Sequence, residues 1–226
     1  MNERYILDNL PAEVSFDKFI AQIMLTEEED IAYVRGLFTT ALSLSRPKAV
    51  YRVCYIDKIE GENVTLSDDA CVFKSRVLAR NLEGIHRVFA YVVSCGTELN
   101  DFVHSQDDPI VQIWFDMFKQ SVLGCAIAGF REHISKKHGI EKLSSMAPGS
   151  GNIDTWQIQQ QRPLFALIGD VEADIGVALT PSLLMEPNKS VSGIMFPSDK
   201  GYVSCELCRR ENCVGRHAPY NAAADV

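Results

Sequence analysis

The sequence predicts a single domain, residues 1–226, that mixes α-helices with β-strands. A long helical pattern that is apolar on almost every side covers residues 108–137. Residues 48–66 have the pattern of a β-hairpin, and residues 87–94 are apolar on both faces, as is typical of a central strand. With 226 residues, of which 46% are hydrophobic and 23% are charged, the chain can bury a substantial core.

Two helices are predicted ahead of the hairpin. Residues 13–24 place apolar side chains on one face of a short helix. Thr26 is a suitable N-cap for a second helix, and the acidic residues 27–29 favour the positive end of its dipole. We expect this helix to run to about Ser45, because Pro47 cannot continue it.

The middle of the chain predicts a short helix over residues 75–82 and then the central strand 87–94. This strand leads through Gly96 into a further helix. Because the ends of central strands commonly hold functional sites, residues 94–99 are a place where a functional group could be exposed.

The longest helix has clear ends. Asp108 is its predicted N-cap, Pro109 suits the first helical position, and Gly139 suits the residue after the last turn. Gly124 and Gly129 within it predict a close crossing by another element.

Shorter elements are predicted downstream. Residues 144–152 have the composition of a loop. Residues 158–168 favour a helix that Pro163 breaks into two pieces, and residues 175–179 and 183–185 favour short strands.

The net charge and the N-terminal sequence limit the classes of function that we expect. A net charge of −8 and a pI near 5.1 do not provide the basic surface that nucleic acid or an anionic membrane requires. No apolar run is long enough to span a bilayer, and residues 1–9 do not have the character of a signal peptide. We therefore expect a cytoplasmic protein with a protein or small-molecule partner, no nucleic-acid partner and no membrane association.

The strand that begins at Ser190 has an unusual composition. Ser190, Val191, Ser192 and Gly193 place two hydroxyls and a glycine where larger apolar side chains would give more packing area. Such residues suggest that a ligand or another backbone approaches the strand closely.

The order of these pieces resembles the activation domain of cobalamin-dependent methionine synthase. The likeness is clearest over residues 145–196, which hold a Pro-Gly loop, a Gln-rich helical segment, the run Leu-Thr-Pro-Ser-Leu-Leu-Met-Glu-Pro and then Ser-Val-Ser-Gly. The chain is most similar to free-standing relatives of that domain that carry a Cys-rich C-terminal segment, here residues 200–220.

The resemblance implies an α+β fold with a curved antiparallel sheet, a long central helix and flanking helices. It also implies a role in rescuing an oxidised corrinoid, since the family's domain binds S-adenosylmethionine and docks over cobalamin. The implied cofactor-binding residues lie in the Pro-Gly loop and in the Ser-Val-Ser-Gly segment: Ala147, Pro148, Gly149, Ser190, Val191, Ser192 and Gly193.

One departure from the family pattern bears on the ligand. The family's loop reads Arg-x-x-x-Gly-Tyr, and placing its Gly on Gly149 puts Ser145 at the Arg position and Ser150 at the Tyr position. Serine replaces neither the charge nor the planar fork with which Arg binds a carboxylate. We therefore expect S-adenosylmethionine to bind weakly or not at all.

The last part of the chain holds a Cys-x2-Cys-x4-Cys cluster, Cys205, Cys208 and Cys213. Two residues between the first pair allow both thiolates to face one centre, so the pattern indicates a metal ion or a cluster. We rank Cys95 first and His217 second as the fourth ligand. An iron–sulfur cluster, a zinc site and reduced free thiols remain open. The other single cysteines, Cys54, Cys71 and Cys125, are interpreted as small buried hydrophobes, as Cys95 also would be if it is not a ligand.

Three functions follow. The first is an accessory protein for reductive reactivation of a corrinoid-dependent methyltransferase, which docks on the corrinoid protein and delivers electrons from an electron-donor protein. The second is S-adenosylmethionine-dependent remethylation of cob(II)alamin as part of methionine synthase activity. The third is a non-catalytic module that binds a corrinoid or a metal. The sequence does not identify catalytic residues.

Overall fold

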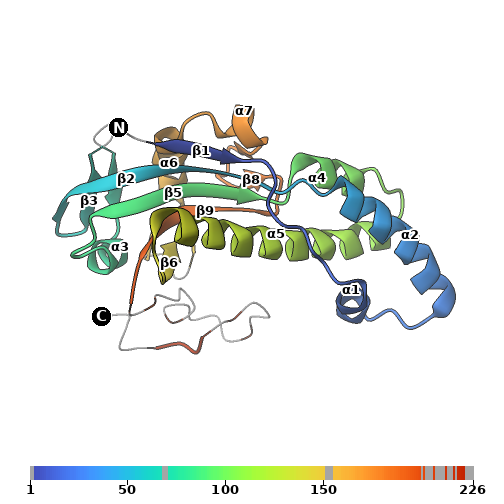
Figure 1. Ribbon diagram of the computed structural model, residues 1–226. Coiled ribbons are helices and arrows are strands. Elements are labelled where there is room, and N and C mark those ends of the chain that lie inside the picture. Colours follow the sequence, from blue (N-terminus) through green and yellow to red (C-terminus); the bar gives the residue numbers. More distant parts are fainter. Residues whose placement is uncertain are drawn as a thin grey trace.

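The computed structural model describes residues 3–67, 71–150 and 155–199, together with residues 201, 206, 212, 216 and 218–221. Its centre is an antiparallel sheet in the order β4-β3-β2-β5-β9-β6, with β1 also paired with β2. The sheet is curved, and the long helix α5 lies along it (Figure 1). The predicted α+β fold, with a curved antiparallel sheet and a long central helix, is therefore confirmed. The strands of this sheet are β1 (Arg4–Leu7), β2 (Lys48–Glu60), β3 (Asn63–Leu66), β4 (Val72–Lys74), β5 (Arg87–Ser94), β6 (Leu143–Met146) and β9 (Ser190–Pro197).

Helices cover both faces of the sheet. They are α1 (Phe16–Ile23), α2 (Glu28–Leu44), α3 (Arg76–Asn81), α4 (Thr97–His104), α5 (Pro109–His138), the 3-10 turn η1 (Ile158–Gln160), α6 (Gln161–Ile168) and α7 (Val171–Ile175). A separate two-stranded ribbon, β7 (Ala178–Leu179) with β8 (Met185–Glu186), precedes β9.

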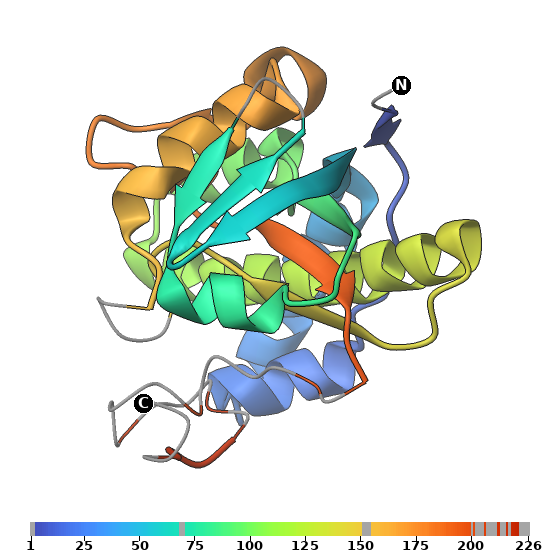
Figure 2. The same cartoon turned by 90° about the vertical axis from the view of Figure 1, so that its left-hand side faces the viewer.

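Two cores lie on the two faces of the sheet. Phe89, Tyr91 and Val93 of β5 pack against α1, α2, α4 and α5, whereas the alternate residues Val88, Ala90 and Val92 pack against α3, α6 and α7. Figure 2 shows α5 on one side of the strands and α6 and α7 on the other. This arrangement explains why β5 is apolar on both faces.

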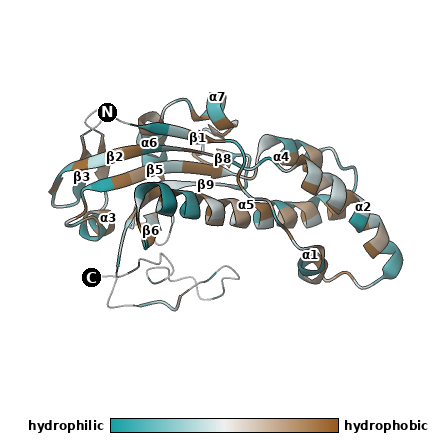
Figure 3. Cartoon of the chain, in the orientation of Figure 1, coloured by the Kyte–Doolittle hydropathy of each residue, from teal (hydrophilic) through white to brown (hydrophobic). Residues whose placement is uncertain are grey.

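Most of the predicted elements are present. Residues 48–66 form the hairpin of β2 and β3, and residues 87–94 form β5 between β2 and β9. In α5 the Asp108 carboxylate accepts a hydrogen bond from the Ile110 amide at 2.8 Å, and Gly139 ends the helix with φ 67°. Figure 3 shows that the C-terminal turns of α5 are hydrophilic. Among the described residues, no helix is both long enough and apolar enough to cross a membrane.

Several local predictions were wrong. Residues 144–146, predicted as a loop, belong to strand β6, because backbone pairing with β9 outweighs the weak strand propensity of two serines. Thr26 is not the N-cap of α2, since that position is held by Glu27. Pro163 does not break the helix, because it lies in the first turn of α6, where the missing amide hydrogen would have no partner within the helix.

Strand β1 and helix α7 were not predicted at all. β1 has only four residues, and its pairing with β2 is a long-range contact that leaves little pattern in the sequence. Of the two helix glycines, Gly129 confirms a close crossing, since a Cβ there would overlap the Pro11 ring. Gly124 does not confirm one, because a Cβ there would lie in open space.

The two glycines Gly193 and Gly124 lead to opposite predictions. A Cβ on Gly193 would overlap the carbonyl oxygen of Met146 on the neighbouring strand, so Gly193→Ala should lower the free energy of unfolding by about 1 to 3 kcal/mol. Gly124→Ala in α5 should raise it by about 0.5 to 1 kcal/mol, because alanine loses less backbone entropy on folding. Urea denaturation of both variants measures these changes. A Gly193→Ala protein as stable as the parent would contradict the proposed overlap.

Candidate functional site

A cavity of about 320 Å³ lies on the α6 face of the sheet, near the start of β9. Three parts of the chain form its wall: the loop after β6, the beginning of α6, and the segment that includes β8 and leads into β9. The lining residues are Pro148, Gly149, Ile158, Gln161, Leu183, Leu184, Met185, Asn188 and Ser190. The cavity thus brings together the predicted loop residues Pro148 and Gly149 with the predicted strand residue Ser190.

The loop after β6 is held in a tight conformation. The Gly149 amide donates to the Trp156 carbonyl at 2.7 Å, and the Ser150 amide donates to the Ala147 carbonyl at 3.2 Å. Gly149 has φ 80°, which a residue with a side chain rarely adopts, and a Cβ there would lie 3.2 Å from Ile158. Glycine is therefore required by the loop conformation, and it leaves the backbone open at the cavity.

The Ser-Val-Ser-Gly segment divides between the two faces of the sheet. Ser190 and Ser192 point toward α6, while Val191 packs in the core on the α5 face. The Ser190 hydroxyl lies 2.9 Å from the Ser94 hydroxyl and 2.8 Å from the Pro187 carbonyl. Of the four residues, Ser190 alone lines the cavity.

Ser192 and Gly193 are accounted for within the fold. Ser192 is 1% exposed, and its hydroxyl donates to Oε1 of Gln161 at 2.7 Å. Gly193 lies against the Met146 carbonyl and the Tyr91 hydroxyl. Their predicted role in facing a corrinoid stays a prediction, and the free protein already satisfies the Ser192 hydroxyl.

Ser145, at the position of the family's Arg, faces away from the cavity. It lies on the α5 face, where its hydrogen bond with Tyr91 partly offsets the effect of burial, which raises the pKa of that tyrosine. A longer side chain at this backbone position would point to the same face.

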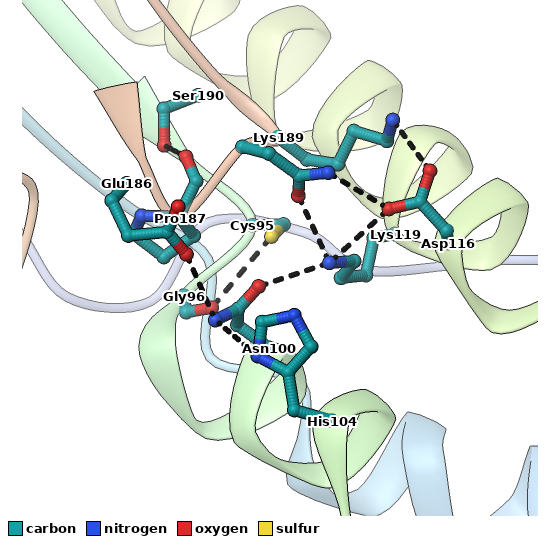
Figure 4. A network of polar contacts seen from close by, with 11 residues as sticks. Cys95, Gly96, Asn100, His104, Asp116, Lys119, Glu186, Pro187, Lys189 and Ser190 are labelled. Atoms are coloured by element: carbon teal, nitrogen blue, oxygen red, sulfur yellow. Dashed lines mark hydrogen bonds and ion pairs between the residues drawn. The ribbon is translucent and has the colours of Figure 1, made fainter. Parts of the chain in front are cut away.

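A buried lysine anchors the segment that leads into β9. Lys119 of α5 is 1% exposed, and its ammonium contacts Asn100 Oδ1 at 2.9 Å, Asn188 Oδ1 at 2.9 Å and Asp116 Oδ1 at 3.2 Å. These three acceptors match its three hydrogens. In Figure 4, Lys119 of α5 lies at the centre of the network, with dashed lines to Asn100 of α4 and to Asp116 of α5.

Asp116 completes the network. Its carboxylate also contacts Lys189 at 2.7 Å and accepts a hydrogen bond from Asn188 Nδ2 at 3.0 Å. Burial alone would raise the pKa of Asp116, but the hydrogen bonds from Lys189, Asn188 and Lys119 outweigh it and hold the pKa below its usual range. Since Asn188 lines the cavity, this buried network fixes one wall of the site.

Cys95, the predicted fourth metal ligand, is fully buried directly after β5. Burial raises its pKa to about 11, so the thiol is protonated at neutral pH. Cys205, Cys208, Cys213 and His217 lie outside the described residues. In the part of the chain that the structure describes, no three His, Cys, Asp or Glu side chains are placed to hold a metal ion. The ligand set therefore stays a prediction.

Sequence reasoning missed Gln161, Asn188 and Lys119. Lys119 carried a usable signal, because a lone cation in an otherwise apolar helical stretch must either reach solvent or find buried partners. Gln161 and Asn188 carried none, since uncharged amides are common in helical segments and loops.

Comparison with known proteins bears on the fold. No protein-family model matches the chain, and a search of curated sequences found no match either. Among solved structures, the crystal structure of the MetH reactivation domain bound to AdoHcy is similar, with a TM-score of 0.57 and 17% sequence identity. The alignment covers 90% of this chain and 81% of that chain. The chain therefore has the fold of the MetH reactivation domain, as its resemblance to the methionine synthase activation domain implied.

We predict that the Lys119 network stabilises the whole fold. Lys119→Met should lower the free energy of unfolding by about 2 to 3 kcal/mol, because it leaves the oxygens of Asn100 and Asn188 without a donor inside the protein. The matched control is Lys136→Met in the same helix, where the lysine is 76% exposed and pairs with Glu132 on the surface. That change should leave stability nearly unaltered. Equal effects of the two substitutions in chemical denaturation would disprove the anchoring role.

Proposed function

We propose that this chain is an accessory protein for the reductive reactivation of a corrinoid-dependent methyltransferase. In this proposal it docks on a corrinoid protein with the face that holds the cavity. The observation that carries the proposal is the meeting of Pro148, Gly149 and Ser190 in one cavity. These residues belong to the two stretches that resemble the activation domain, and the fold is that of the MetH reactivation domain.

The chemistry of the cavity supports a corrinoid partner. The rim of a corrin ring carries methyl groups and uncharged carboxamide arms. Leu183, Leu184 and Met185 supply apolar contacts, and Gln161, Asn188 and Ser190 supply uncharged hydrogen-bonding groups. Leu184 is 60% exposed, which suits an apolar residue that a partner covers.

Docking is tested with the exposed apolar rim, because changes there should leave the fold intact. Leu184→Glu should weaken association with a cobalamin-loaded methyltransferase at least tenfold, since it places a charge in the covered contact. The matched control is Val72→Glu on the edge strand β4, which is 49% exposed and lies outside the cavity. Surface plasmon resonance measures both. Unchanged binding by Leu184→Glu, with unchanged thermal stability, would exclude docking through this face.

A second candidate function is S-adenosylmethionine-dependent remethylation of cob(II)alamin. It is favoured by the AdoHcy that the similar MetH domain binds. Among the residues that the structure describes, no charged side chain lines the cavity, so they offer no counter-charge to the carboxylate or the ammonium of an amino acid. The cavity therefore suits the accessory role better than the methyl-donor role. The third candidate, a non-catalytic corrinoid or metal-binding module, would use the same docking face.

We predict weak S-adenosylmethionine binding. Ser145 cannot substitute for an arginine, and its side chain lies on the opposite face of the sheet from Gln161. Isothermal titration of the isolated protein should give a dissociation constant no tighter than the high micromolar range. A value in the low micromolar range would favour the methyl-donor function instead.

The electrons for reactivation are proposed to pass through the C-terminal cysteines. An iron–sulfur cluster on Cys205, Cys208 and Cys213 could reach the low potential that reduction of cob(II)alamin requires, whereas zinc has no redox chemistry. Three nearby arginines, Arg209, Arg210 and Arg216, would offset the negative charge of the thiolates. We favour the cluster, reduced by an electron-donor protein.

Anaerobic purification tests this assignment. The protein should contain iron and sulfide and absorb in the visible range, and replacing all three cysteines by alanine should abolish both. Stoichiometric zinc without iron or visible absorption would show that the segment is structural and that electrons come from another protein. Retention of iron by the triple variant would show that other residues are the ligands.

A further inference from the structure

The cavity contains one buried amide whose hydrogen-bonding capacity is only half used. Gln161, the first residue of α6, is 4% exposed and lines the cavity. Its Oε1 accepts the hydrogen bond from the Ser192 hydroxyl at 2.7 Å. Among the described residues, its amide nitrogen has no hydrogen-bond partner. The nitrogen is not one of the fully buried, unsatisfied atoms of the described residues, so its two hydrogens are open to the cavity and can donate to a ligand acceptor in place of water.

Ser192 determines which end of the Gln161 amide meets the cavity. Ser192 is 1% exposed and lies within the sheet. Because the Gln161 oxygen accepts the hydrogen bond from the Ser192 hydroxyl, the two hydrogens on the amide nitrogen remain for the cavity side. The buried pair thus presents a donor to the cavity.

The second amide that lines the cavity, Asn188, is hydrogen-bonded to the charged residues Lys119 and Asp116. Lys119 donates to its oxygen at 2.9 Å, and its nitrogen donates to Asp116 at 3.0 Å. This leaves Asn188 one acceptor lone pair and one hydrogen for a ligand. The charges of Lys119 and Asp116 face each other and Asn188, so the wall that they support is uncharged.

From this arrangement we infer that the cavity is a subsite for an uncharged carboxamide, with Gln161 Nε2 donating to the carboxamide oxygen and Asn188 accepting from its nitrogen. The inference rests on the proposed function and deepens it, because carboxamide arms are the polar groups at the rim of a corrinoid. Among the described lining residues, a carboxylate would lose its hydration without meeting a cation, and an ammonium would meet no anion. About 320 Å³ is at the low end for ligand sites, which suits one arm of a large ligand.

The test uses dicyanocobinamide, an uncharged corrinoid that keeps the carboxamide arms and lacks the nucleotide. Titration of the full chain should show binding, which Gln161→Met should weaken about three- to tenfold through the loss of one hydrogen bond. Gln161→Glu should weaken it further, because a carboxylate oxygen would face the carboxamide oxygen. Gln159→Met and Gln159→Glu are the matched controls, since Gln159 is exposed on η1 and lies outside the cavity. These two variants should bind as the parent does.

Three other outcomes would contradict the carboxamide subsite. Binding of dicyanocobinamide that is equally tight in the parent and in both Gln161 variants would overturn the subsite and leave the docking proposal standing. Adenosine provides the comparison arm, because it offers ring-nitrogen acceptors without a carboxamide. Gln161-dependent binding of adenosine alone would assign the cavity to a nucleoside and overturn the carboxamide assignment. If neither probe binds at millimolar concentration, the carboxamide assignment is also overturned. The Leu184→Glu experiment tests the docking proposal separately.

Discussion

The site depends on the burial of one ammonium group. Lys119 lies in the middle of α5, where solvent cannot reach it, so its charge must be neutralised and its three hydrogens must be accepted inside the protein. The acceptors come from α4, from α5 itself and from the segment before β9, and the last of these, Asn188, is 69 positions from Lys119 in the sequence. Because the buried ammonium needs these acceptors, the segment before β9 must lie against α5, and this contact places Asn188 in the wall of the cavity.

The cavity wall also depends on the fact that both faces of the sheet are covered by hydrophobic cores. Successive residues of β9 point to opposite faces, so the Ser-Val-Ser-Gly segment serves two cores at once. Gly193 allows the backbone of β6 to lie close beside β9 in the sheet, while Ser192 orients Gln161 on the α6 face. Residues that the resemblance groups into a single binding motif therefore have separate physical tasks, and Ser190 is the one that reaches the cavity.

In the described part of the chain, the charged side chains near the cavity do not line it. Lys119, Asp116 and Lys189 form a compact ionic group next to Asn188, and the described side chains that line the cavity are apolar groups, a hydroxyl and two amides. Such a surface can distinguish an uncharged amide from a zwitterionic amino acid, because the latter would have to give up its hydration without compensation. This property connects the missing arginine of the Pro-Gly loop with the proposed preference for a corrinoid.

The sequence by itself determined the elements that local chemistry dictates. Asp108, Pro109 and Gly139 marked the ends of α5, and the apolar run 87–94 identified the central strand, because caps and periodicity act within a few residues of the chain. The tertiary structure alone decided β6, where pairing with β9 made a strand of two serines, and the meeting of Gln161 with Ser192 across 31 positions. Hydrogen bonds between distant, uncharged side chains depend on the packing of the sheet, and they leave no periodic pattern that a sequence could reveal.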